Sequence, residues 1–219
     1  MIPLNMYSHV DCFGVPLEKK IDELFNKSDG FFIELGANDG LKQSNTAYLE
    51  FKKNWKGILI EPSLKGYELC KQNRPNSIVL NYACVADTYN ESVISGDFID
   101  NSLMGSINGN RLKRNNTVSV PAMPLELILD QYYNTDNTID FLSLDTEGYE
   151  LNILKGLNLK KYRPKYMLIE IYTKDYTDIV SFLMNHKYSL QCNFTNYNKT
   201  TNPHWDGTHN DYLFMDIIL

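Results

Sequence analysis

Short apolar runs alternate with amphipathic stretches along most of the chain. Phe31–Leu35 is followed by Gly36, and the next run, beginning at Gly57, ends at Glu61 and Pro62. Five later runs have the same character: Ser77–Ala83, Ile139–Asp145, Tyr166–Ile171, Tyr188–Asn193 and Tyr212–Leu219. Short continuous apolar runs bounded by turn residues are typical of strands that are buried on both faces.

The stretches between these runs are predicted to be helices. Ser44, Asn45 and Thr46 offer capping oxygens ahead of Ala47–Lys53, whose last turn is basic. Further helices are expected over Ser63–Asn73, Leu125–Gln131, Leu151–Leu157 and Asp175–His186. Strands that alternate with helices predict an α/β fold with a mostly parallel sheet and helices on both faces. The last two runs have no helix between them, so the final strand is expected to be antiparallel.

One segment breaks this alternation. Between Val85 and Asn116, Gly, Asn, Asp and Ser replace the apolar periodicity, which predicts an insertion with a strand pair near 92–95 and 117–120. With no repeat and no linker, residues 1–219 are interpreted as a single domain. Its expected parts are an N-terminal arm and helix (1–29), a cofactor-binding half (30–83), the insertion or substrate loop (84–123) and a substrate-side half (124–219).

Composition excludes several classes of protein. The 219 residues carry 21 Lys+Arg against 27 Asp+Glu, a net charge of −6, which gives no basic surface for nucleic acid. No apolar run approaches the ~20 residues needed to cross a bilayer, so no membrane insertion is expected. The four cysteines are far apart and the first residues do not resemble a secretory signal, so we expect reduced thiols and a cytoplasmic location.

Acidic residues stand at or near the ends of four predicted strands, and parallel strands bring these ends to one edge of the sheet, where ligands bind in such folds. They are Glu34, Glu61, Asp145 and Glu170. Glu61 follows the glycine-flanked turn Gly36–Gly40 at the spacing expected of a carboxylate that accepts hydrogen bonds from ribose hydroxyls. The pattern therefore predicts a ligand that contains adenosine.

The turn also discriminates between adenosine ligands. A dinucleotide-binding turn needs a middle glycine that is missing here, and Glu34, Asn38 and Asp39 crowd the position of a diphosphate. Carboxylates repel a diphosphate but suit an ammonium and a sulfonium group. S-adenosylmethionine is thus favoured, and an NAD-dependent oxidoreductase with the same sheet is kept as an alternative.

Several segments resemble the FkbM-type family of S-adenosylmethionine-dependent methyltransferases. The similarity runs from about Gly30 to Ile171 and includes FIELGANDG, SNTAYLE, WKGILIEP, RPNSIVLNYA and IDFLSLDTEGYELNILKGLN. Its most distinctive motif is D-x-E-G-x-E, here Asp145–Glu150. The lead-in Tyr7-Ser8-His9 has His where the family has Gln, so His9 is given no role beyond a structural one.

The resemblance implies a class I methyltransferase (Rossmann-like) fold, with seven strands of which the last is antiparallel. It also implies methylation of a hydroxyl, often on a carbohydrate or glycan; a deoxyhexose such as rhamnose or fucose is our first expectation. By the same resemblance, Glu61 would hold the ribose, and Asp145 would lie under the sulfonium or the acceptor hydroxyl. The other implied cofactor-binding residues are Glu34, Gly36, Asn38, Asp39 and Gly40 around the methionine portion, with Pro62, Ser63, Ala83 and Cys84 beside the base. Asn45 is a further expected cofactor-binding residue.

A sugar hydroxyl is a weak nucleophile, so a base must take its proton. Asp145, Glu147 and His209 are the predicted catalytic residues; Glu147 has the alternative of capping the following helix. His209 and His204 fall in the polar loop 195–210, whose aromatic, carboxylate and amide groups suit a sugar. A cation between Asp145 and Glu170 is a further option, but the resemblance does not require one, and no metal ligand is predicted.

The function expected from the sequence is therefore S-adenosylmethionine-dependent O-methylation of a carbohydrate hydroxyl. A second alternative beside the oxidoreductase is a non-catalytic cofactor-binding domain that accompanies glycosyltransferase domains. The intact D-x-E-G-x-E motif favours catalysis.

Overall fold

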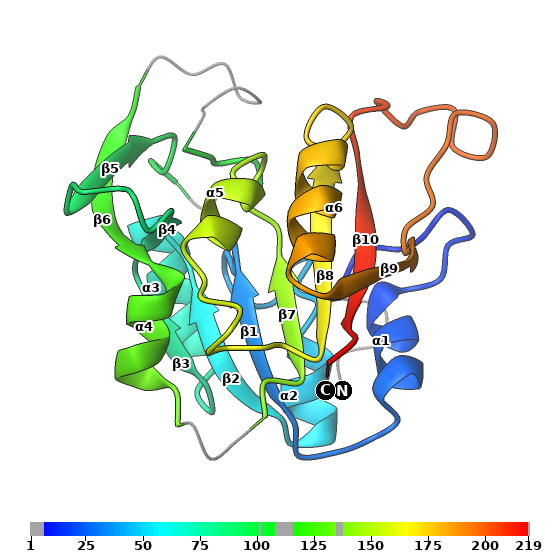
Figure 1. Ribbon diagram of the computed structural model, residues 1–219, viewed down its shortest axis with the longest axis horizontal. Coiled ribbons are helices and arrows are strands. Elements are labelled where there is room, and N and C mark those ends of the chain that lie inside the picture. The colour runs from blue at the N-terminus through cyan, green and yellow to red at the C-terminus, as the bar shows by residue number, and fades with distance from the viewer. Residues whose placement is uncertain (1–6, 101, 108–115, 135–137, 219) are drawn as a thin grey trace.

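A seven-stranded sheet forms the centre of the computed structural model, which describes residues 7–100, 102–107, 116–134 and 138–218 (Figure 1). The strand order is β3-β2-β1-β7-β8-β10-β9. All neighbours pair in parallel except β10, which is antiparallel to β8 and β9. The strands are β1 (Phe31–Leu35), β2 (Lys56–Ile60), β3 (Ile78–Leu80), β7 (Phe141–Leu144), β8 (Tyr166–Tyr172), β9 (Tyr188–Asn193) and β10 (His209–Asp216). The expected mostly parallel sheet with an antiparallel last strand is confirmed.

Helices cover both faces of this sheet, as expected; Figure 1 shows α5 and α6 in front of it and α2 behind. The helices are α1 (Leu17–Phe25), α2 (Ala47–Lys53), α3 (Leu64–Asn73), α4 (Leu125–Tyr132), α5 (Glu150–Lys155) and α6 (Tyr176–Asn185). Within the described ranges, no helix is long and apolar enough to span a bilayer. The division of the chain into an arm, two halves and an insertion stays a prediction.

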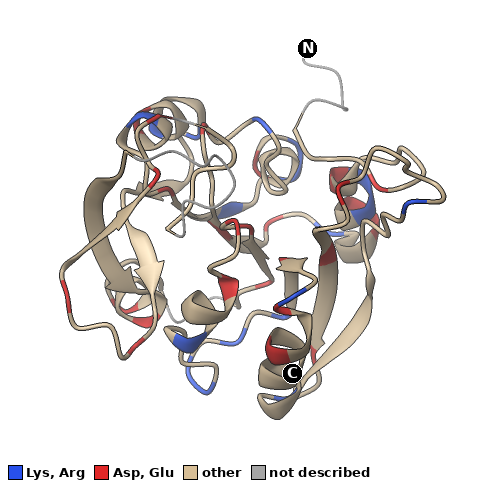
Figure 2. Cartoon of the chain, turned by 90° about the horizontal axis from the view of Figure 1, so that it is seen from above, with Lys and Arg blue, Asp and Glu red and all other residues tan. Residues whose placement is uncertain are grey.

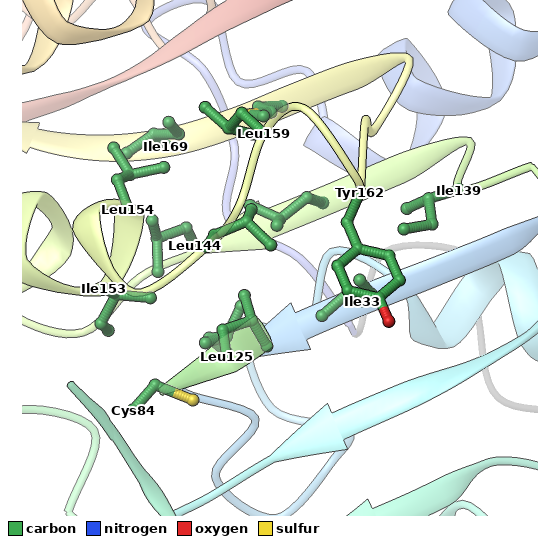
Figure 3. Packing of buried hydrophobic residues seen from close by; sticks show 14 of the residues in the cluster. Ile33, Cys84, Leu125, Ile139, Leu144, Ile153, Leu154, Leu159, Tyr162 and Ile169 are labelled. Carbon is green, nitrogen blue, oxygen red and sulfur yellow. The ribbon is translucent and has the colours of Figure 1, made fainter. Parts of the chain in front are cut away.

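Two hydrophobic clusters lie on the two faces, because successive side chains of a strand point to opposite sides. On β1, Ile33 packs in the cluster that includes Leu154 of α5 and Leu125 of α4, whereas Phe32 packs with Ile21 of α1. Figure 3 shows the first cluster between strands and helices. Burial of each large apolar side chain contributes about 1.5–3 kcal/mol, so both faces anchor the strands whose ends form the site.

A second, three-stranded sheet corrects one expectation. β4 (Ala83–Val85) pairs in parallel with β6 (Val118–Pro124), which pairs antiparallel with β5 (Val93–Gly96). The predicted strand pair of the insertion is confirmed, but Ala83 does not continue the third strand of the central sheet. That strand ends at Leu80. The side-chain amide of the next residue, Asn81, donates to the backbone oxygens of Glu61 (2.8 Å) and Pro62 (2.9 Å). Residues 101 and 108–115 of the insertion lie outside the described residues.

The strand directions determine where the candidate residues meet. β1, β2, β7 and β8 are parallel, so their carboxyl ends share the upper edge of the sheet in Figure 1. β10 is antiparallel to β8 and begins at that edge, with His209 opposite Tyr172. His209 is therefore the first residue of β10. The prediction that it lies in the loop 195–210 is wrong.

Candidate active site

A cavity opens at this edge, between the turns that follow the parallel strands. One end is lined by Ala37 and Asn38, after β1, and by Glu61–Ser63, after β2. Gly36 also lines the cavity and lies against the backbone of Asp145. The other end is lined by Asp145–Glu147, after β7, together with Glu170 and His209. Ala83 and Cys84 of β4 form a side wall. The cavity thus joins the predicted cofactor-binding residues to the predicted catalytic ones.

Glu61 is the central group at the first end. It is only 6% exposed, and its two carboxylate oxygens accept hydrogen bonds from the backbone N–H groups of Asn38 (2.7 Å) and Ser63 (2.8 Å). Burial, with a smaller contribution from the charge of Asp39, raises the pKa of Glu61 to about 7. The two backbone bonds fix the carboxylate at the cavity wall, where its remaining lone pairs can accept from a ligand.

The neighbours of Glu61 hold it in place. Asn38 has a left-handed backbone conformation (φ 47°), which presents its N–H to Glu61. Ser63 caps α3, because its hydroxyl accepts from the N–H of Gly66 at 3.2 Å. Pro62 also lines the cavity. Of the expected cofactor-binding residues, Gly36, Asn38, Glu61, Pro62, Ser63, Ala83, Cys84 and Asp145 therefore lie at the cavity.

Four other residues of the expected cofactor-binding set lie outside the cavity lining. The alternation along β1 turns Glu34 toward α2, where its carboxylate accepts from the Ser44 hydroxyl (2.9 Å) and the Asn45 N–H (3.0 Å). Asn45 donates to the Ser143 hydroxyl at 3.0 Å. Asp39 accepts from two backbone N–H groups of its own turn, and Gly40 lies against Arg74. These four residues stabilise the turn after β1 from outside the cavity lining.

Arg74 connects the residues that stabilise the first turn, and the sequence analysis did not identify it. It is fully buried at the C-terminal end of α3 and donates to Glu50 Oε2 (2.7 Å) and the Gly40 backbone oxygen (2.9 Å). It also donates to the Thr46 hydroxyl at 2.9 Å. A single guanidinium thus connects the first turn, α2 and α3. An arginine just after a predicted helix is usually a surface residue. The one sequence signal for Arg74 is that it begins the segment RPNSIVLNYA, which resembles the family.

The wall beside Cys84 is mostly apolar. Burial raises the pKa of the Cys84 thiol, so the thiol stays uncharged. The rest of this wall comes from the insertion, which sequence reasoning assigned to the acceptor without naming residues. Its apolar members that line the cavity are Phe98, Leu103, Met104 and Ile107.

Carboxylates dominate the other end of the cavity. Figure 2, which looks down on this edge, shows acidic segments around the middle of the molecule. One carboxylate oxygen from each of Asp145, Glu147 and Glu170 lies within 4.8 Å of the others. Burial and the neighbouring carboxylates raise the pKa values of Asp145 and Glu170 well above the ordinary range. Asp211, opposite Glu170 on β10, adds to this repulsion, and burial raises its own pKa to about 6.

The turn after β7 decides between the two readings of Glu147. Glu147 has a left-handed backbone (φ 58°), lines the cavity and accepts a hydrogen bond from the Tyr172 hydroxyl at 2.5 Å. The turn before α5 is stabilised instead by Glu150, whose carboxylate accepts from the N–H groups of Thr146 (2.9 Å) and Gly148 (3.0 Å). The alternative that Glu147 caps the helix is therefore wrong.

The histidines divide in an unexpected way. His209 lines the cavity, with Nε2 3.2 Å from Glu170 Oε1 and Nδ1 2.7 Å from the Thr208 hydroxyl. His204 is exposed and does not line the cavity. His9 does line it, with a side-chain hydrogen bond to Gln43, and burial lowers the pKa of its imidazole. The Tyr7-Ser8-His9 lead-in was the signal that could have indicated this position.

Comparison with known proteins identifies the family of the chain. The model of the methyltransferase FkbM domain matches residues 34–194, which is well over half of the chain. No curated protein matches the sequence. The family match favours a methyltransferase over the oxidoreductase alternative.

Solved structures show the same fold at low sequence identity. Precorrin-6y C5,15-methyltransferase from Geobacter metallireducens is 11% identical, with a TM-score of 0.51 and coverage of 96% of this chain and 94% of that one. TrmK from M. capricolum in complex with S-adenosylhomocysteine is 10% identical, with a TM-score of 0.51 and coverage of 91% of this chain and 67% of that one. Aeropyrum pernix fibrillarin with bound S-adenosylmethionine is also 10% identical, with a TM-score of 0.51 and coverage of 86% and 67%.

The fold and the family agree with what the sequence predicted. The neighbours have the class I methyltransferase fold, and the family model covers both the first turn and the D-x-E-G-x-E motif that line the cavity. S-adenosylmethionine is the cofactor of such a domain. The chain belongs to the family of FkbM methyltransferase domains.

Proposed function

We propose that the protein is an S-adenosylmethionine-dependent O-methyltransferase that acts on a hydroxyl of a carbohydrate. The observation that carries the proposal is the single cavity that joins Glu61 at one end to Asp145, Glu147 and His209 at the other. Such a cavity can hold a nucleoside and an acceptor side by side. The proposed location of the reaction is the cytoplasm, in keeping with four free cysteines.

The first end suits the nucleoside. Glu61 is fixed by two backbone N–H groups and can accept from both ribose hydroxyls. The apolar wall that includes Cys84 and Phe98 provides a surface for the adenine ring. Gly36 lets the turn after β1 pack directly against the backbone of Asp145, so that both turns face the ligand.

The second end suits the reaction. The hydroxyl oxygen attacks the methyl carbon, the carbon–sulfur bond breaks with its electron pair going to sulfur, and the hydroxyl proton passes to a base. His209, Asp145 and Glu147 are the groups at this end that can receive that proton. Alignment of oxygen, carbon and sulfur in one cavity supplies a large entropic contribution, and the base typically adds ~10²–10⁴ in rate.

The acceptor is proposed from the surroundings of His209. Trp205 donates from its indole N–H to the His209 backbone oxygen at 3.0 Å, which fixes an aromatic side chain beside the cavity residue. Asp206 accepts from the N–H of Thr208 at 2.9 Å in the same loop. A flat apolar ring next to polar groups fits one face of a sugar ring and its hydroxyls. This arrangement supports a neutral carbohydrate, with a deoxyhexose as the first choice.

The test is transfer of labelled methyl from S-adenosylmethionine to methyl rhamnoside, methyl fucoside and oligosaccharides that end in these sugars. We expect an alkali-stable methyl ether on a ring hydroxyl, located by mass spectrometry. Transfer of the label to none of these sugars, but to a carboxyl or amine group of a non-carbohydrate acceptor offered beside them, would overturn the carbohydrate assignment.

Two variants separate catalysis from mere binding. His209→Gln is expected to lower kcat by ~10²–10⁴ while the affinity for S-adenosylhomocysteine changes little. Glu61→Gln should mainly weaken cofactor binding. Tight binding of the cofactor without label transfer to any of these acceptors would support the alternative of a non-catalytic domain.

A further inference from the structure

The imidazole of His209 has a polar partner at each of its ring nitrogens. Nδ1 lies 2.7 Å from the Thr208 hydroxyl oxygen, and Nε2 lies 3.2 Å from Glu170 Oε1. A neutral imidazole carries one proton, so one nitrogen donates a hydrogen bond and the other can accept a proton. The two partners therefore determine which nitrogen of His209 is the base.

The Thr208 hydroxyl favours one of the two tautomers. It has a single proton, which it donates to Asp206 Oδ1 at 2.6 Å, because a carboxylate can only accept. Toward His209 the hydroxyl oxygen is then an acceptor, so the imidazole proton lies on Nδ1. The two distances agree with this assignment, since 2.7 Å is a short hydrogen bond and 3.2 Å is at the long end of the range.

Backbone contacts hold Thr208 and Asp206 in this position. The N–H of Thr208 also donates to Asp206 Oδ1, at 2.9 Å, and the backbone oxygen of Thr208 accepts from the Thr173 N–H at 2.8 Å. Thr173 directly follows β8, the strand that carries Glu170. The loop before β10 is thus bound to the strand whose carboxyl group faces Nε2.

Glu170 connects Nε2 of His209 to the D-x-E-G-x-E turn. A side-chain hydrogen bond joins Glu170 to Asp145. Two carboxyl groups form such a bond only when they hold a proton between them, and burial raises the pKa of both groups well above the ordinary range. Asp145, Glu170 and His209 Nε2 therefore form a continuous path for a proton.

We propose that Thr208 and Asp206 are positioning residues for methyl transfer, which keep the imidazole proton of His209 on Nδ1 and make Nε2 the nitrogen that accepts a proton. This inference rests on the proposed function. As the acceptor oxygen attacks the methyl carbon, the electron pair of the carbon–sulfur bond goes to sulfur and the hydroxyl proton passes to Asp145. The proton between Asp145 and Glu170 passes to Nε2. The resulting imidazolium has an acceptor at each nitrogen, the Thr208 hydroxyl and the Glu170 carboxylate.

The test reads the tautomer of His209 by NMR of the imidazole nitrogens, on the full chain without cofactor, at a pH at which the imidazole is neutral. We expect the proton on Nδ1 in the wild type and in Thr208→Ser, which keeps the hydroxyl. In Thr208→Val the hydroxyl is lost, so the proton should shift toward Nε2. A proton on Nε2 in the wild type, or the same tautomer in the wild type and in Thr208→Val, overturns the proposal.

Steady-state kinetics with a methylated sugar tests the role of Thr208 in the reaction. Thr208→Val should lower kcat at least about tenfold with little change in KM for the cofactor, because the wrong tautomer cannot take the proton, and Thr208→Ser should keep most of the activity. Thr201→Val is the matched control. The Thr201 hydroxyl donates to the Asn202 side chain at 2.9 Å in the same loop, but Thr201 is outside the cavity lining.

Two kinetic outcomes contradict the role of Thr208. They are an unchanged kcat for Thr208→Val and an equal loss of kcat in Thr201→Val. Failure of the wild type to methylate any of the sugars counts against the proposed function alone, since the tautomer is measured without an acceptor.

Discussion

The backbone oxygen of Asp145 lies 1.8 Å from the point where a side chain on Gly36 would begin. The turns after β1 and β7 are therefore in direct contact, and the N–H of Asp145 donates to the Leu35 oxygen at 3.2 Å. This contact brings the cofactor turn and the D-x-E-G-x-E turn to one cavity. Gly36 is needed for that approach more than for flexibility.

We predict that Gly36→Ala destabilises the protein by about 2–5 kcal/mol, because it combines an unfavourable positive φ with a clash against backbone. The matched control is Gly14→Ala. Gly14 has nearly the same φ (79° against 80°) but no atom within 4 Å of its would-be side chain. Its substitution should cost only the conformational part, about 1–2 kcal/mol. Urea unfolding measures both, and equal losses would show that the contact with Asp145 is unimportant.

Arg74 offers a test of the support behind the first turn. Arg74→Met should lower the free energy of unfolding by about 3–5 kcal/mol, because it leaves the buried Glu50 carboxylate without its charged partner. Lys65→Met, an exposed position on the same helix, should change it by less than about 0.5 kcal/mol. Chemical denaturation of both variants gives the comparison; similar small losses would mean that the network is dispensable.

Cofactor affinity should depend on pH through Glu61. Burial raises the pKa of Glu61 to about 7 in the unliganded protein, so a large part of it is protonated at neutral pH. Ribose hydroxyls bond more strongly to the ionised carboxylate, so cofactor binding should expel the proton. Affinity for S-adenosylhomocysteine is therefore expected to fall as the pH drops from 8 through about 7 to 6, at most tenfold per pH unit. Calorimetry across that range measures it.

The contribution of Glu61 to the free energy of unfolding changes with pH in the opposite direction to that of an ordinary ion-paired carboxylate. The pKa of Glu61 is higher in the folded chain than the usual 4.5, so the proton stabilises the folded state. This contribution is complete below pH 4.5 and is lost as the pH rises to about 7. Glu61→Gln should remove both pH dependences. A variant that keeps the wild-type pH profile of binding would assign it to another group.

Tyr172 is predicted to be a positioning residue through its hydrogen bond to Glu147. Tyr172→Phe should lower the kcat of methyl transfer, because Glu147 loses the donor that orients it, while KM for the cofactor stays close to the wild-type value. Tyr67→Phe, on α3 away from this end, is the control. Steady-state kinetics of both variants tests this prediction. An unchanged kcat for Tyr172→Phe would show that the Tyr172 hydroxyl does not contribute to methyl transfer.

The parts of the fold that the sequence predicts are those set by local pattern. The apolar runs identify the seven strands, and the turns that close them place Glu61, Asp145 and Glu147 at one edge. Long-range contacts are not visible in such a pattern. Pairing of β4 with β6, the approach of Phe98 and Leu103 to the cavity and the position of His9 each join segments far apart in the chain.

Glu34 is a residue that the sequence predicts at the site but that long-range contacts place elsewhere. Its place at the end of β1 resembles that of a ligand-binding carboxylate, yet the alternation of the strand directs it to α2 and Arg74. A helix N-terminus in need of acceptors competes for a nearby carboxylate. The sequence shows both groups, but only the folded chain shows which of them meet.

A crystal structure of the protein with S-adenosylhomocysteine tests the central claim most directly. We expect the ribose hydroxyls within hydrogen-bonding distance of Glu61, the adenine against the wall that includes Cys84, and the sulfur directed toward Asp145 and His209. A nucleoside bound elsewhere, or oriented with its base toward Asp145, would contradict it.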